Sequence, residues 1–285
     1  MDAPADAVLG WAGPRLRDLP WRRTRDPWAV LVSELMLQQT QVARVVERYG
    51  AFLARFPDPT SCAAATVGDV VREWQGLGYN RRAVSLHGAA GAVVAAGAFP
   101  DTLDGLLALP GVGPYTARAV LAFAFEHDAA VVDTNIARVL ARVAGRPLTA
   151  REAQASADAW LPAGEAWAWN QAVMDLGALV CAARPPRCGV CPVADGCAWR
   201  RAGNPAPDPA VGSAGVSGGQ SRFAGSDRQG RGRLVDALRG GAVPPERLAG
   251  VMGWPGDEPR AARVAATLLS DGLAVVDVDG RFALP

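Results

Sequence analysis

The chain has 285 residues, of which 50% are hydrophobic and 20% charged, with a formal net charge of +1 at pH 7. This composition suits a globular protein with one or two sizeable cores, and no apolar run is long enough to span a bilayer. All 29 basic residues are arginine, which excludes an enzyme that forms a Schiff base on a lysine side chain.

Helical patterns dominate the first 200 residues. Asp26-Pro27 is typical of a helix start, and this helix is expected to run to Tyr49. Further helices are predicted at residues 67–74, 81–96, 103–107, 115–125, 135–144, 150–160 and 168–181. No convincing alternating strand occurs before residue 222, so this part is predicted to be all-α.

Glu34 lies on the apolar side of the first helix, four residues after Val30 and three before Leu37. Burial disfavours the charged carboxylate, which suits a general acid near neutral pH. The alternative is a buried glutamate with a structural role. Polar side chains at Gln38, Gln39 and Thr40 follow and are candidates for contact with bases, although they also fit a plain polar helix surface.

Two glycine turns have features that suit nucleic acid. In the first, Gly76 to Tyr79, an aromatic side chain is placed to stack on a base. In the second, Gly111, Val112 and Gly113 precede a helix, so backbone N–H groups and the helix N-terminus would form a site for one phosphate. An ordinary turn is the alternative for both.

Asp133 stands at the start of the helix predicted from Asn135, 20 residues after Gly113. An aspartate there is usually an N-cap. It would also suit a carboxylate that faces a cationic sugar, and the two interpretations are compatible.

Four cysteines, Cys181, Cys188, Cys191 and Cys197, form a compact and uneven cluster. Four thiolates with wide, uneven loops favour a [4Fe–4S] cluster, whereas structural zinc sites usually present two short pairs. Disulfides are disfavoured because the chain start lacks a secretory pattern, and a cytoplasmic protein is expected. Cys62 is expected to be a buried apolar residue.

The C-terminal quarter differs in composition. Residues 202–221 are rich in Gly, Pro, Ser and Ala, which predicts a flexible linker. Residues 222–285 suggest three helices and a hairpin at Asp279-Gly280, as in a winged helix or a generic α+β module. Phosphate contacts are predicted for four arginines, Arg222, Arg228, Arg231 and Arg233.

Several segments in order resemble the helix-hairpin-helix DNA glycosylases with an iron–sulfur cluster, and most closely the MutY-type adenine glycosylases. They are LPWRRTRDPW (19–28), SELMLQQTQV (33–42), GLGY (76–79), LPGVGPYTA (109–117), VVDTNIARVLAR (131–142), NQAVMDLGALVC (170–181) and the four-cysteine loop. A related lyase branch carries lysine where this chain has Tyr115.

The resemblance implies an all-α, two-domain helix-hairpin-helix glycosylase fold with a [4Fe–4S] loop and a small winged-helix-like C-terminal domain. A six-helix barrel would span residues 26–130, and residues 1–25 with 131–201 would form the cluster-bearing domain. Residues 202–221 and 222–285 would be the linker and the C-terminal domain.

The resemblance also implies residue roles. Glu34 would protonate adenine and Asp133 would stabilise the cationic sugar, with support from Tyr115 and Asn135. Arg17, Leu19 and Trp21 would line the adenine pocket, and Gln39 and Tyr79 would enter the duplex. The tail is too short for the domain that usually senses 8-oxoguanine in this family.

The predicted activity is hydrolysis of adenine opposite 8-oxoguanine or guanine, on double-stranded DNA, by a monomer with no membrane partner. Two alternatives are a mismatch glycosylase that removes thymine or a deaminated base, and a non-catalytic iron–sulfur protein that binds DNA or senses redox state. The presence of both Glu34 and Asp133 argues against a pure binding protein.

Overall fold

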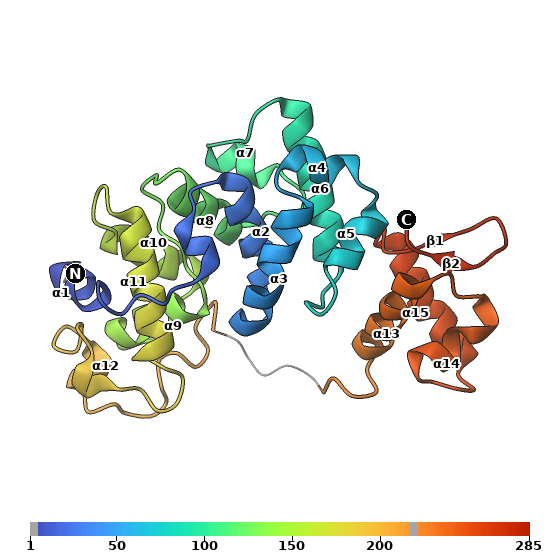
Figure 1. Ribbon diagram of the computed structural model, residues 1–285. Coiled ribbons are helices and arrows are strands. Elements are labelled where there is room, and N and C mark those ends of the chain that lie inside the picture. The colour runs from blue at the N-terminus through green and yellow to red at the C-terminus, as the bar shows by residue number, and fades with distance from the viewer. Residues whose placement is uncertain (1–4, 217–221) are drawn as a thin grey trace. The chain divides into compact units, whose positions relative to one another are not determined.

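The computed structural model describes residues 5–216 and 222–285 of a mostly helical chain, as predicted (Figure 1). The chain divides into two compact units. The first comprises residues 1–27, 101–104 and 113–219, and the second comprises residues 28–100, 105–112 and 220–285. No helix in the described parts of the chain is long and apolar enough to cross a membrane.

The first unit is built around one central helix, α11 (Ala166–Leu179), which packs against α1 (Ala5–Ala12), α8 (Pro114–Ala124) and α9 (Thr134–Ala144). In turn α9 contacts α10 (Ala150–Trp160) and α12 (Ala198–Arg201). Short 3₁₀ turns lie at Pro20–Arg23 and Cys188–Val190. The buried apolar faces of α9 and α11 form the core of this unit, in which Leu140 and Leu176 are almost fully enclosed.

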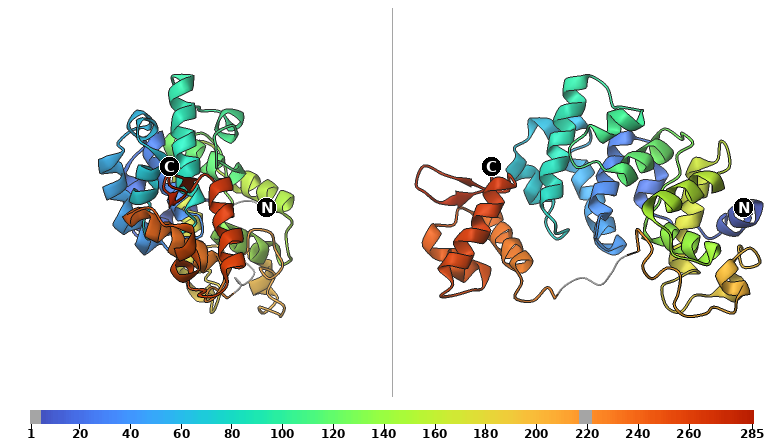
Figure 2. Two further views of the ribbon diagram at one scale, coloured as in Figure 1. Left: turned by 90° about the vertical axis from the view of Figure 1, so that its right-hand side faces the viewer. Right: turned by 180° about the vertical axis from the view of Figure 1, so that it is seen from behind.

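In the second unit, α4 (Pro59–Ala64) and α5 (Val67–Glu73) pack on the long helix α6 (Arg81–Ala96). The remaining helices between residues 27 and 112 are α2 (Pro27–Leu37), α3 (Val42–Arg55) and α7 (Leu103–Leu107), and the first two residues of α7 are assigned to the first unit (Figure 2). Edge-to-face contacts of Phe52 with Phe56 and with Trp74 fill the core.

The predicted helix from residue 26 to Tyr49 is interrupted, contrary to the sequence prediction. The helix α2 ends at Leu37, and a turn at Gln38-Gln39-Thr40 separates it from α3. Gln39 has φ of +54°, in the left-handed region that stops a helix. Side-chain donors from Arg82 take up the carbonyls of Leu35 and Met36, so the helix end is stabilised without a local Gly or Pro.

The C-terminal module, residues 222–285, has the predicted three helices and strand pair. They are α13 (Asp227–Gly240), α14 (Leu248–Met252, after a 3₁₀ turn at Pro245–Arg247), α15 (Glu258–Ser270), β1 (Val275–Val276) and β2 (Phe282–Ala283). The strands are antiparallel, with Val275 opposite Ala283. A loop of residues 277–281 joins them, longer than the predicted tight turn at Asp279-Gly280.

The module packs directly on helices of the second unit. Arg239 of α13 donates hydrogen bonds to the carbonyl of Val71 (3.1 Å) and to Oδ1 of Asn80 (3.1 Å). The backbone N–H of Gly68 donates to the carbonyl of Pro285 (2.8 Å), and a Cβ at residue 68 would lie 2.5 Å from that oxygen. The module is therefore part of the second compact unit.

The segment predicted as a flexible linker is held against the first unit over much of its length. The hydroxyl of Ser213 accepts from the N–H of Leu148 (3.1 Å), and the N–H of Ala214 donates to the Leu148 carbonyl (2.9 Å). Ala210 and Ser213 are buried. The last five residues of the predicted linker, 217–221, lie outside the described residues.

Two of the four arginines predicted to contact phosphates make contacts within the module. Arg231 forms an ion pair with Asp271 (2.5 Å), and Arg233 donates to the Met252 carbonyl (3.2 Å). Arg228 lies over the ring of Phe223, at 5.6 Å from its centroid. These contacts fix the side chains within the module, and the predicted phosphate contacts stay a prediction.

Candidate active site and cysteine loop

Glu34 lies in a helix that is buried on every side. All residues of α2 from Trp28 to Met36 are buried, and Glu34 itself is 4% exposed. The sequence predicted an apolar stripe, and the structure encloses all of α2 except its two ends, Pro27 and Leu37. Glu34 therefore lies inside this part of the protein and not on a solvated face.

Asp133 is the N-cap of α9, as its position in the sequence indicated. Oδ1 accepts hydrogen bonds from the backbone N–H groups of Asn135 (2.9 Å) and Ile136 (2.7 Å), and Oδ2 accepts from Asn135 Nδ2 (2.8 Å). Burial raises the pKa of Asp133, while these bonds act in the opposite direction. The carboxylate therefore has one fixed orientation at the positive end of a helix.

The segment before Asp133 is also fixed from α11. The side chain of Asn170 accepts from the N–H of Val131 (3.0 Å) and donates to the Ala129 carbonyl (2.9 Å). These bonds position the extended stretch that leads to Asp133. Sequence reasoning did not identify Asn170 as a residue that positions Asp133.

Arg138 connects the Asp133 cap to the cysteine loop. Its Nη2 donates to Asn135 Oδ1 (2.9 Å) and to the Gly177 carbonyl (2.7 Å), and its Nε donates to the Cys181 carbonyl (2.7 Å). A Cβ at Gly177 would lie 2.6 Å from Cβ of Asn135, so only glycine allows α9 and α11 this close. One arginine thus couples the first cysteine to the residue that orients Asp133.

All four cysteines of the loop line one cavity, and none of them is in a disulfide; they are Cys181, Cys188, Cys191 and Cys197. Burial raises the pKa of the Cys181 thiol, and the guanidinium of Arg142 acts to lower it. Within the described residues, no three His, Cys, Asp or Glu side chains form a ready site for a single metal ion.

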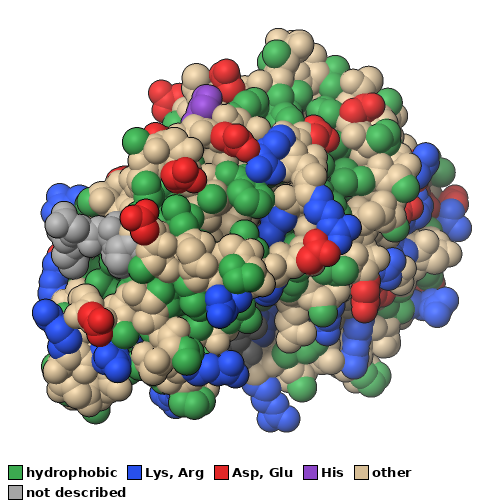
Figure 3. Space-filling view, turned by 60° about the vertical axis from the view of Figure 1, so that its left-hand side comes forward, with side chains coloured by type: hydrophobic (Ala, Val, Ile, Leu, Met, Phe, Trp, Pro, Cys, Tyr) green, Lys and Arg blue, Asp and Glu red, His purple; other side chains and the backbone are tan. Residues whose placement is uncertain are grey.

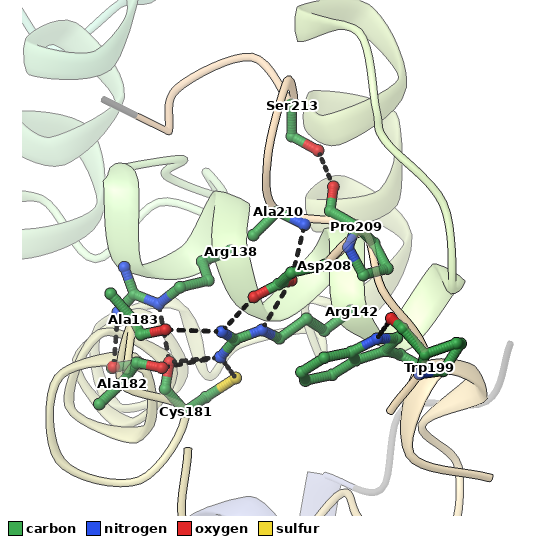
Figure 4. A network of polar contacts seen from close by, with 12 residues as sticks. Arg138, Arg142, Cys181, Ala182, Ala183, Trp199, Asp208, Pro209, Ala210 and Ser213 are labelled. Atoms are coloured by element: carbon green, nitrogen blue, oxygen red, sulfur yellow. Dashed lines mark hydrogen bonds and ion pairs between the residues drawn. The ribbon is translucent and has the colours of Figure 1, made fainter. Parts of the chain in front are cut away.

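Arg142 organises the start of this loop (Figure 4). It donates to the carbonyls of Ala182 (2.8 Å) and Ala183 (3.1 Å) and to Cys181 Sγ (3.3 Å). Its counter-charge is Asp208, which accepts from Nε (3.1 Å) and Nη2 (2.6 Å). Asp208, which follows the four cysteines in the sequence, thus holds Arg142 in contact with the first of them, Cys181.

Three residues predicted for the adenine pocket, Arg17, Leu19 and Trp21, lie in the segment after α1. Leu19 and Trp21 are buried at 9% and 8% exposure. Arg17 pairs with Asp175 of α11 through Nη2 (2.6 Å), and Arg22 binds the same carboxylate (2.8 and 2.9 Å). Sequence reasoning missed Asp175 and Arg22, which anchor this segment.

The glycine turn at residues 111–113 joins α7 to α8. Gly111 has φ of +77°, and a Cβ there would lie 2.5 Å from Cβ of Ser85. The N–H of Val112 donates to the Leu109 carbonyl (3.1 Å), so it is used within the turn, and a phosphate would have to be bound by neighbouring amides. Gly113 caps α8, whose first turn carries the half-buried Tyr115.

Gln39 and Tyr79 are both exposed, Tyr79 at 40%. Gln38 and Thr40 are half-buried in the turn after α2. Arginine side chains are interspersed with apolar ones on the face drawn in Figure 3. Exposed aromatic and amide side chains on turns suit contact with a nucleic acid.

Comparison with known proteins shows the family to which this chain belongs. A model described as "HhH-GPD superfamily base excision DNA repair protein" matches residues 32–163. An adenine DNA glycosylase of Mycobacterium tuberculosis is 45% identical over 98% of this chain and 92% of its own. The chain belongs to the adenine DNA glycosylases. The chain contains no lysine.

Two other similarities concern thymine enzymes. A thymine/uracil-DNA glycosylase of Pyrobaculum aerophilum is 38% identical over 67% of this chain and 88% of its own. A solved thermostable thymine-DNA glycosylase matches with a TM-score of 0.64 and 29% identity, over 69% of this chain and 94% of that chain. The helical glycosylase fold is thus shared, whereas the mycobacterial similarity extends over nearly the whole chain.

Proposed function

We propose that this adenine glycosylase hydrolyses the N-glycosidic bond of adenine opposite 8-oxoguanine or guanine in double-stranded DNA. The observation that carries the proposal is the carboxylate of Asp133, held by three N–H donors at the start of α9. A fixed anion of this kind stabilises the positive charge that develops on a sugar as its base leaves.

In the proposed reaction, Glu34 donates a proton to N7 of adenine. The C1′–N9 bond then breaks and its electron pair passes to the base, which leaves in neutral form. Asp133 stabilises the sugar cation until a water molecule adds to C1′, and the proton that this water loses returns to the Glu34 carboxylate, which leaves an abasic site and restores the acid. Asn135 holds Asp133 in place through Nδ2. Tyr115, at the start of α8, is proposed to support Glu34 and Asp133.

The proposed DNA contacts follow from exposure and fold. Gln38, Gln39, Thr40 and Tyr79 are proposed to enter or border the base stack where adenine is extruded. Gly111, Val112 and Gly113 are proposed to bind a phosphate through the amides that the turn leaves available. Arg17, Leu19 and Trp21 are proposed to border the base, with Arg17 held by Asp175.

Cys181, Cys188, Cys191 and Cys197 are proposed to hold a [4Fe–4S] cluster. The four thiols line one common cavity, and their intervening loops of six, two and five residues suit four thiolates around a cubane better than the two short pairs usual in a structural zinc site. When bound, the cluster cross-links residues 181–197. The proposed enzyme is a monomer of the bacterial cytoplasm.

The test is a panel of duplexes that each contain one mismatch, with single-turnover excision measured after alkaline cleavage. Adenine opposite 8-oxoguanine or guanine should be removed, and thymine or uracil opposite guanine should remain. Glu34→Gln should abolish excision and retain duplex binding, because it removes the proton donor and preserves shape. Excision of thymine or uracil by the wild type would instead favour the alternative function indicated by the thymine relatives.

A further inference from the structure

Two turns of the second unit hold their exposed tips in an unfavourable backbone conformation. Gln39 has φ of +54° and Tyr79 has φ of +45°. Residues with a side chain rarely adopt this left-handed region, because Cβ approaches the following carbonyl. Both turns therefore need contacts that hold them in this form.

The guanidinium of Arg82, in the first turn of α6, supplies contacts to both turns. Its Nη1 binds the end of α2 and the turn after it, through the carbonyls of Leu35 (2.6 Å), Met36 (2.9 Å) and Gln38 (2.7 Å). Its Nη2 and Nε bind the second turn, through the carbonyls of Leu77 (3.1 Å), Gly78 (2.9 Å) and Tyr79 (3.3 Å). The Arg82 side chain thus binds carbonyls in the turn that carries Gln39 and in the turn that carries Tyr79.

A further bond joins the turns through Thr40. Arg82 Nη2 donates to Thr40 Oγ1 (3.0 Å), and the same hydroxyl donates to the Leu77 carbonyl (3.1 Å). Arg82 is 8% exposed, with its guanidinium 5.4 Å from the centroid of the Trp74 ring. Burial lowers the pKa of Arg82 to about 10, which still leaves it a cation at neutral pH.

The partners of Arg82 require the shape of a guanidinium. They are six backbone carbonyls and one hydroxyl, spread over two chain segments. A guanidinium presents five N–H donors in a rigid planar fork, whereas a lysine ammonium is a compact charge with three. Lysine at this position would keep the charge and lose the simultaneous hold on both turns.

We propose that Arg82 is a positioning residue that locks the two turns into one preorganised wedge, so that Gln39 and Tyr79 enter the DNA stack together. The inference rests on the proposed function, in which these two side chains enter the duplex. Its consequence is specific: Arg82 assists extrusion of the base and leaves the bond-breaking step unchanged. Preorganisation of this kind reduces the ordering cost on binding.

The test compares Arg82→Lys with Arg81→Lys, a matched control at the neighbouring arginine, whose side chain is 73% exposed. Each enzyme receives two duplexes with adenine opposite 8-oxoguanine. One is fully stacked, and in the other an abasic analogue flanks the adenine and leaves it poorly stacked. Single-turnover rates are measured at saturating enzyme.

Arg82→Lys should lose roughly 10- to 100-fold on the stacked duplex, since small misplacements cost rates of this order. On the poorly stacked duplex it should stay close to the wild type, and Arg81→Lys should be unchanged on both. Equal losses of Arg82→Lys on the two duplexes, or no loss, would overturn the inference. If wild type excises adenine from neither duplex, the proposed function itself fails.

Thr40→Val provides a second variant in case Arg82→Lys does not fold. It preserves side-chain shape and removes the hydroxyl that joins the two turns. Its loss should be smaller than that of Arg82→Lys and again confined to the stacked duplex. A Thr40→Val enzyme with wild-type rates on both duplexes, or with equal losses on both, would contradict the proposed lock.

Discussion

Substitution of Asp208 tests whether the segment after the cysteines fixes the first part of their loop. Asp208→Ala removes the carboxylate that accepts from Nε (3.1 Å) and Nη2 (2.6 Å) of Arg142. The Arg142 side chain is 2% exposed, so its charge would remain enclosed without its acidic partner. The carbonyls that Arg142 holds, at Ala182 and Ala183, should then open more often.

The size of the effect follows from the burial of the two partners. Removal of one partner of a fully buried ion pair costs about 3–5 kcal/mol. Asp208 is 25% exposed, so water can replace part of the lost interaction, and we expect about 1–3 kcal/mol, the cost of leaving a buried polar group without its partner. Asp208→Asn keeps one acceptor oxygen, and its effect should be about half as large.

Hydrogen exchange of the backbone amides in residues 181–191 measures this opening directly. A cost of about 1–3 kcal/mol corresponds to exchange that is roughly 5- to 150-fold faster. Asp195→Ala is the matched control, because Asp195 lies in the same loop, is fully exposed and approaches Arg200 only to 3.9 Å. Unchanged exchange in Asp208→Ala, or the same acceleration in Asp195→Ala, would refute the reasoning.

Three further predictions concern the metal group, the reaction product and pH. The purified protein should absorb near about 400 nm and contain about four irons; a colourless protein with one zinc would contradict the cluster. The product should be an intact abasic strand until alkali is added, because the chain has no lysine, and borohydride should trap little covalent adduct. Trapping of a covalent protein–DNA adduct in high yield would contradict this prediction, because it would require an amine other than a lysine side chain. Burial acts to raise the pKa of Asp175, but its bonds to Arg22 and Arg17 outweigh burial and lower it. The stability from this anion is present above the unfolded pKa of about 3.9 and is lost as pH falls through the lower folded value. The gap in unfolding free energy between wild type and Asp175→Asn should therefore narrow as pH drops below about 4 in denaturant melts, and a constant gap would count against the ion pairs.

Local patterns in the sequence predicted most of the helices. The start and end of α6, α7 and α10 coincide with the predicted limits, since glycine, proline and capping residues mark them. The end of α2 was not predictable in this way. Its terminal carbonyls are bound by Arg82, which is 47 residues away from Leu35, and no local residue marks the stop.

In the candidate site, too, interactions between neighbouring residues were predictable and those between residues far apart in the sequence were not. Asp133 and Asn135 interact two residues apart, so the cap was visible in the sequence. The pairs of Asp175 with Arg22 and of Arg142 with Asp208 join residues 153 and 66 positions apart. The composition of residues 202–221 indicated a flexible linker. The bonds that hold part of this segment, from Asp208 and Ser213, join residues far apart in the sequence, and composition does not reveal them.

A competition experiment tests the central claim most directly. One reaction contains equal amounts of a duplex with adenine opposite 8-oxoguanine and a duplex with thymine opposite guanine, and mass spectrometry measures the free bases released. The ratio of released bases reports the ratio of kcat/KM for the two substrates. We predict that adenine is released from the first duplex while thymine stays bound in the second, and that Glu34→Gln releases neither base. Preferential release of thymine, or wild-type release of adenine by Glu34→Gln, would contradict the account.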